Sequence, residues 1–167
     1  MIAYCIQYVE SVLLSQNVKE IYTKPEDATR HKGSRYALIL EDNPEQNERD
    51  GSKIAYFDDM VNRVRTYHIR AYQTTLSLEV RLVDKTPEAA TGMKNAFLSS
   101  LGKRFIDPAD YAIEVSAGTA KLITDKSILT SGTGYSVTIT FTGGIYTTRQ
   151  VPLLGDVVPE GEFIKEG

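Results

Sequence analysis

Two segments of the chain alternate strictly between apolar and polar side chains. In "TTLSLEVRLVD", residues 74–84, one face carries four aliphatic residues: Leu76, Leu78, Val80 and Leu82. In "YSVTITFT", residues 135–142, one face carries Tyr135, Val137, Ile139 and Phe141, and the other carries one serine and three threonines. A period of two is typical of a half-buried strand. Both segments therefore predict strands that pack one face on a core and expose the other.

A glycine pair follows the second of these strands. Gly143 and Gly144 permit a bulge or bend that a bulky residue would resist, so we expect them to redirect the chain before "IYTTRQ". The apolar residues beyond it have no obvious local core, which predicts a subunit interface, with docking on the same domain as the alternative. The candidate interface residues are Ile145, Tyr146, Arg149, Val151, Pro152, Leu153 and Leu154.

Two amphipathic helices are expected. Residues 1–16 carry apolar side chains at helical spacing: Ile2, Cys5, Ile6, Val9, Val12 and Leu13. A second helix begins with Thr86 as N-cap and Pro87 at the first helical position. Its apolar stripe consists of Ala90, Met93, Phe97, Leu101 and Phe105.

The segments between these elements complete the predicted fold. Residues 19–35 read as a short extended piece and a loop, because Pro25 argues against a regular helix. A strand at 36–40, one or two strands at 53–72, and strands at 111–117 and 120–126 follow. The order predicts a single α+β domain at residues 1–154, with a mainly antiparallel or mixed sheet and two main helices on one face. Residues 155–167 are expected to form an exposed tail.

Residues 41–50 stand out as an acidic stretch. They include five carboxylates against one arginine: Glu41, Asp42, Glu45, Glu48 and Asp50. Such a segment cannot pack on a core, so it predicts an exposed loop. We expect either a loop that meets a partner or one that is merely solvated.

Composition excludes several classes of protein. The 167 residues suit one domain, with 41% hydrophobic and 25% charged residues and no run of about 18 apolar residues that could cross a membrane. The start of the chain has no Lys or Arg before its apolar residues, which argues against a signal peptide and favours a soluble protein assembled in the cytoplasm. A net charge of −3 argues against a protein that grips nucleic acid.

No pattern in the sequence predicts chemistry. His31 and His68 do not belong to a metal-binding spacing and are expected to be solvated, and the glycines of "SGTG" lead into a strand rather than a phosphate-binding helix. We therefore expect no enzyme activity, no metal and no cofactor, although a nucleophile assembled only in three dimensions stays open. Arg63, Arg65 and Arg70 are expected on a solvent face or against an acidic partner rather than against phosphate.

The order of elements resembles the tail terminator, or tail completion, proteins of tailed bacteriophages. The resemblance rests on the N-terminal helix, the strand "TTLSLEVRLVD", the helix after "KTPEAA" and the closing "FTGGIYTTRQVP", and it covers nearly the whole chain. It is greatest from Tyr67 to Val151. The acidic stretch and the tail "GDVVPEGEFIKEG" have no counterpart in it.

The resemblance implies a structural protein of the virion at the junction of tail and neck. Such proteins form a ring, typically of six subunits, that caps the tail tube, ends its polymerisation and joins the head or neck, and in contractile tails can meet the sheath. DNA passes through the lumen without specific binding, which makes the acidic stretch a candidate lumen or partner loop. The alternatives are a neighbouring head–tail connector or neck protein and, from another class, a small α+β enzyme or ligand-binding domain.

Overall fold

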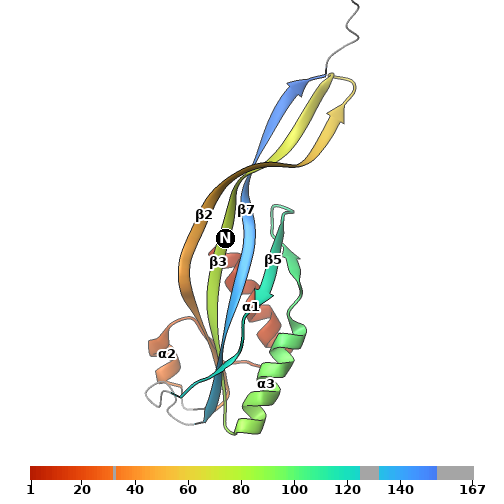
Figure 1. Cartoon of the computed structure of the whole chain (residues 1–167). Helices are drawn as coiled ribbons and strands as arrows, with labels where there is room; N and C mark the ends of the chain where they lie inside the picture. Colours follow the sequence, from red (N-terminus) through yellow and green to blue (C-terminus); the bar gives the residue numbers. More distant parts are fainter. Residues whose placement is uncertain (32, 125–131, 154–167) are drawn as a thin grey trace, which may run out of the picture. The chain divides into compact units, whose positions relative to one another are not determined.

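The computed structural model describes residues 1–31, 33–124 and 132–153. It is an α+β structure with a mixed, mostly antiparallel seven-stranded sheet, which confirms the predicted fold class (Figure 1). In chain order the elements are α1 (Ile2–Ser15), β1 (Ile21–Tyr22), α2 (Pro25–Thr29), β2 (Tyr36–Asp59), β3 (Val64–Asp84), α3 (Pro87–Ser100), β4 (Arg104–Ile106), β5 (Ala112–Ala117), β6 (Lys121–Leu122) and β7 (Thr133–Pro152). The strand order is β1-β2-β3-β7-β5-β4, and β6 also pairs with β7.

Contacts divide the described chain into two compact units. The core unit comprises residues 1–48 and 73–144, apart from the undescribed positions, and the three-stranded unit comprises residues 49–72 and 145–153. The strands β2, β3 and β7 each contribute residues to both units. The predicted domain end at residue 154 and the tail beyond it lie outside the described residues.

The two alternating segments form the centre of the core unit, as predicted. Leu76, Leu78, Val80 and Leu82 of β3 and Val137, Ile139 and Phe141 of β7 are buried in one cluster with Cys5, Val9 and Leu13 of α1 and Met93 and Phe97 of α3. Both main helices therefore cover the same face of the sheet. Thr86 caps α3, because its Oγ1 accepts a hydrogen bond from the Ala89 amide at 3.2 Å.

A third, short helix corrects the prediction of a loop around Pro25. Pro25 occupies the first helical position of α2, where its fixed φ and missing N–H fit a helix start. Ala28 of α2 packs with Tyr36, Leu38 and Val83 in a separate small cluster. Because Leu38 alternates with Ala37 and Ile39 of the main cluster, α2 lies on the opposite face of the sheet from α1 and α3.

The second main helix is shorter than its apolar stripe suggested. It ends at Ser100, and Leu101 is its extended C-cap. Phe105 lies instead in β4, where its ring stacks on Tyr8 with centroids 4.5 Å apart. The helix was predicted too long because the helical spacing of apolar residues continues past its end into β4, and both segments pack on the same core.

The predicted acidic loop is also wrong, because residues 41–50 belong to the continuous strand β2. They are exposed, as expected, but β3 provides a hydrogen-bonded neighbour for their backbone. Thr74 of β3 donates a 2.7 Å hydrogen bond to Asn47 Oδ1. The strand β1 pairs with β2 only at Ala37 and Leu38, so Pro44 falls on an edge, where the absence of an N–H is tolerated.

The glycine pair does not interrupt β7, which runs from Thr133 to Pro152. Gly143 is buried, and a Cβ there would lie 3.0 Å from Met1 Sδ and 3.3 Å from Ile113 Cγ1. The glycine therefore allows close packing of α1 and β5 on the strand. The chain beyond it stays in the sheet and pairs beside β3, where Leu153 donates a 2.8 Å hydrogen bond to the Arg63 carbonyl.

Candidate protein interface

The three-stranded unit contains most of the exposed large apolar side chains of the described chain. None of its described residues is fully buried. Seven of the eleven exposed large hydrophobic residues in the described ranges lie here: Ile54, Tyr56, Phe57, Met60, Val61, Tyr72 and Ile145. Phe57 is 66% exposed and Val61 is 92% exposed. Concentrated apolar exposure of this kind marks an interaction surface.

Polar and cation–π contacts hold this unit together in place of a core. Arg65 of β3 donates two hydrogen bonds to Asp58 of β2, at 2.6 and 2.7 Å. The same guanidinium lies 4.5 Å from the centre of the Tyr56 ring, and Lys53 Nζ lies 4.3 Å from that of Tyr67. Bidentate pairs and cation–π contacts fix side-chain geometry even where water is near.

A turn and two ion pairs link β2 with β3. Asp59 Oδ1 accepts the amides of Val61 and Asn62 at 2.9 and 3.0 Å, which closes the turn between the strands. Arg65 pairs with Asp58 near the turn, and Arg70 pairs with Asp50 farther along the strands. Gly51, next to Asp50, has a positive φ of 80°, which glycine adopts without strain.

The pKa values of three carboxyls depend on these contacts. The Arg65 hydrogen bonds lower the pKa of Asp58, and the Ser52 hydroxyl, followed by Arg70, lowers that of Asp50. The Asn62 amide lowers the pKa of Asp59. Hydrogen bonds that favour the charged form stabilise the folded state only while the carboxyl is ionised.

We therefore predict that the three-stranded unit loosens on acidification before the core unit. Because the folded pKa values lie below the unfolded value of about 3.9, the stabilisation is complete above that pH and is lost as pH falls through the folded values. Two-dimensional NMR between pH 6 and pH 2 should show amide signals of residues 49–72 collapsing first. Asp58→Asn should reduce this pH dependence. Signals that persist to pH 2 for residues 49–72 while those of β3 residues 76–82 vanish would contradict it.

Two of the three arginines that were predicted as charged contacts form ion pairs within the chain. Arg65 and Arg70 form ion pairs with Asp58 and Asp50, whereas Arg63 lies exposed at the turn with a positive φ of 52°. In the acidic stretch, Glu45 Oε2 lies 3.5 Å from the Met1 amino group. Glu41, Asp42 and Glu48 are exposed and make no ion pair with any described residue.

The predicted interface after Gly144 belongs to the third strand of the unit. Ile145 is 49% exposed, Arg149 and Pro152 are exposed, and Tyr146, Val151 and Leu153 are half-buried. Leu154 lies outside the described residues. The sequence interpretation missed the exposed residues of β2 and the turn, above all Phe57, Met60 and Val61. The segment that could have indicated them is "YFDDMVNR", in which apolar residues lie in and beside a turn and have no core to pack on.

One residue expected to be solvated is partly buried. His31 Nδ1 lies 3.0 Å from the Tyr22 hydroxyl, which is 3.0 Å from Glu20 Oε2, and its ring also packs on Tyr36. Burial, together with the Glu20 hydrogen bond, raises the pKa of Tyr22. His31 Nε2 is buried without a hydrogen-bond partner in the described structure, and a Cβ at Gly33 would lie 2.5 Å from it. This arrangement packs the segment after α2 on Tyr22 of β1 and Tyr36 of β2.

Other candidates for chemistry are equally limited. Burial raises the pKa of the Cys5 thiol to about 12, so the reactive thiolate is disfavoured. Within the described ranges, no group of His, Cys, Asp and Glu residues could hold a metal ion. None of the helices in those ranges is long and apolar enough to cross a membrane.

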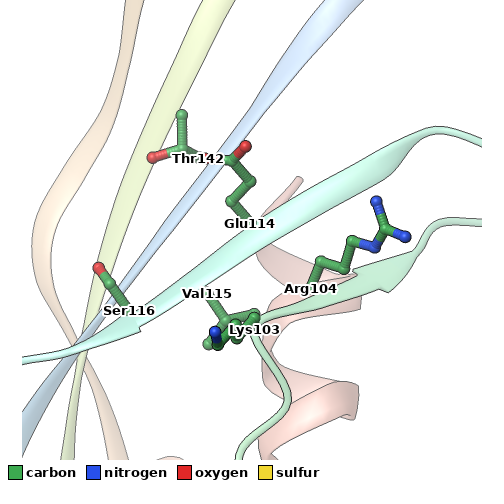
Figure 2. Close-up of a pocket in the computed structure, with 6 residues that line it drawn as sticks. All are labelled: Lys103, Arg104, Glu114, Val115, Ser116 and Thr142. Atoms are coloured by element: carbon green, nitrogen blue, oxygen red, sulfur yellow. The ribbon is translucent and has the colours of Figure 1, made fainter.

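Besides a pocket of about 410 Å³ lined by Tyr22, Asp27, Arg30 and His31, the core unit carries a surface pocket of about 500 Å³ at its β4 edge. Its lining comes from β4, β5, β7 and the residue before β4: Lys103, Arg104, Glu114, Val115, Ser116 and Thr142 (Figure 2). Glu114 pairs in register with Arg104 on one side and Thr142 on the other. The Arg104 and Glu114 side chains diverge in Figure 2, and no ion pair joins them.

Comparisons with known proteins add no relative. The chain matches no protein-family model, and the search of curated proteins finds no similar sequence.

Proposed function

We propose that this protein is a structural assembly protein of a tailed-phage virion, a tail terminator that closes into a ring on the end of the tail tube. The ring ends tube polymerisation and offers a surface to the head or neck. The observation that carries the proposal is the three-stranded unit, which has exposed apolar side chains and no buried core in its described part. The resemblance in element order supplies the identity of the assembly.

Binding a partner would recover the free energy that this exposure costs. Full burial of one large apolar side chain contributes about 1.5–3 kcal/mol, so burying even a few of the seven stabilises a complex substantially. Aromatic residues also dominate interface energetics because they bring large area with few rotatable bonds. The unit is thus better suited to a protein partner than to a small molecule, which requires a concave site.

The backbone of the unit is also open to a partner. Its strand order is β2-β3-β7, so in the described chain residues 49–59 and 145–152 have a neighbouring strand on one side only. An unpaired strand edge accepts another strand or must be blunted. Two different edges meeting head to tail generate a closed ring when the rotation closes.

The function can be tested in an assay in which tail tube protein from the same virion polymerises. Added at one ring per tube end, the protein should shorten and narrow the tube length distribution seen by electron microscopy. The variant Phe57→Ser/Val61→Ser should require at least about tenfold more protein for the same effect, as expected for loss of interface anchors. The matched control Leu14→Ser/Leu122→Ser changes residues that are 56% and 54% exposed but lie in the core unit.

Two results would reject the proposal. One is an unchanged length distribution at saturating wild-type protein. The other is equal activity of the Phe57→Ser/Val61→Ser variant and the wild type, because the three-stranded unit would then not be the contact surface.

A further inference from the structure

The two edges of the sheet in the core unit carry opposite charges. Beyond Leu38 the strand β2 has no neighbour on its outer side in the described chain, and its exposed residues 41–48 include four carboxylates. At the other end of the strand order, β4 has β5 on one side only. Lys103 and Arg104 lie there, on the wall of the pocket in Figure 2.

Most of these charges have no ion-pair partner within the described part of one copy. Glu41, Asp42 and Glu48 form no ion pair, and neither Lys103 nor Arg104 does. The path from β2 to β4 crosses β3, β7 and β5. At about 4.8 Å per strand this is about 19 Å along the sheet, well beyond the screening length of about 8 Å at physiological salt. No ion pair joins the two edges within the described part of one subunit.

The pocket suits an extended acidic segment better than a single anion. Its volume of about 500 Å³ accommodates several side chains, and Ser116 and Thr142 add hydroxyl donors beside the two cations. An extended segment turns neighbouring side chains to opposite faces, so in residues 41–48 either Glu41 or Asp42, but not both, could face Lys103 and Arg104. Glu114 opposes such a ligand and leaves the pocket one net positive charge.

We propose that this pocket receives the acidic stretch of β2, residues 41–48, from a second copy of the chain. The contact is heterologous, because the β2 edge of one subunit meets the β4 edge of the next, and such contacts propagate into rings. This inference rests on the proposed ring and names the interface that closes it. Complementary charge then sets the order and spacing of subunits, which is the usual role of charged contacts across an interface.

Charge reversal tests the interface by sedimentation or light scattering of the full chain. Lys103→Glu/Arg104→Glu makes both edges acidic, and Glu41→Lys/Asp42→Lys/Glu48→Lys makes both basic. Each variant alone should need at least about tenfold more protein than wild type for half-maximal assembly, and raising salt from about 0.1 M to about 1 M should shrink the difference as the screening length falls from about 10 to 3 Å. An equimolar mixture of the two should assemble again, because opposite edges then alternate.

Two further variants separate this contact from a loss of folding. Glu114→Gln removes a repulsive charge and should lower the half-maximal concentration about twofold, an effect that damage to the fold cannot produce. Lys19→Glu/Lys24→Glu reverses two exposed lysines elsewhere in the core unit and should leave assembly unchanged. Circular dichroism melts of all variants check that the fold is retained.

The outcomes distinguish the inference from the proposed function. If wild type assembles and both reversed variants assemble equally well, the inference is wrong and the ring stands. Loss of assembly without rescue in the mixture also overturns it, because the two charged edges would then contact something other than each other. A wild-type protein that stays monomeric at every concentration, with and without tail tubes, overturns both.

Discussion

Replacing Phe141 by alanine should lower the free energy of unfolding by about 3–5 kcal/mol, the usual cost of removing a buried phenylalanine. Phe141 is completely buried in β7. Its ring meets Tyr8 of α1 edge-on at 6.3 Å and Phe105 of β4 at 6.2 Å, so one side chain joins three elements. Urea or guanidinium unfolding followed by circular dichroism measures the change.

Phe57→Ala provides the matched control, since it makes the same chemical change on the strand β2. Phe57 is 66% exposed, so its loss should change the free energy of unfolding by no more than about 0.5 kcal/mol. Equal destabilisation by the two substitutions would contradict the division of the chain into a packed core unit and a three-stranded unit without a core.

The contrast between Phe141→Ala and Phe57→Ala would separate residues that stabilise the fold from residues that we propose act in assembly. Every fully buried hydrophobic residue of the described chain lies in the core unit, whereas most of the exposed large ones lie in the three-stranded unit. The strands β2, β3 and β7 therefore pass from a packed core to a part without buried residues along their length. Substitutions near their core ends should affect stability, and those near the turn should affect partner binding.

The core could be predicted because period-two alternation has few structural solutions. Leu76, Leu78, Val80 and Leu82 had to face one way, and the N-terminal stripe from Cys5 to Leu13 offered a matching helical face. The N-cap of α3 could also be predicted, because Thr86 and Pro87 combine two local signals of a helix start. Local sequence determines such features without reference to the rest of the chain.

The errors arose where a distant neighbour decides the structure. Residues 41–50 form a strand because β3 runs beside them, which their own polar composition does not reveal. The glycine pair was expected to interrupt the strand, but β7 is continuous, and Gly143 packs against Met1 and Ile113, which are far away in sequence. The exposed residues Phe57, Met60 and Val61 were missed because exposure of an apolar residue depends on what fails to cover it.

Gly132→Ala should also destabilise the protein strongly, through the backbone rather than through a cavity. Gly132 precedes β7 with φ of 115°, a conformation that residues with a Cβ rarely adopt. A Cβ there would lie 2.4 Å from the carbonyl oxygen of Asp84 at the end of β3. Backbone strain and overpacking each cost about 1–3 kcal/mol, so we expect a loss of about 2–5 kcal/mol.

Two glycine controls separate the causes of that loss. Gly51→Ala meets no atom within 4 Å but keeps a positive φ of 80°, so its cost should be backbone strain alone, about 1–2 kcal/mol. Gly92→Ala also meets no atom within 4 Å, and Gly92 lies inside α3, so it should stabilise the protein by about 0.8–1 kcal/mol. If Gly132→Ala costs no more than Gly51→Ala, the Asp84 carbonyl must move aside without penalty, and the close approach of β3 to the start of β7 is not a constraint on the fold.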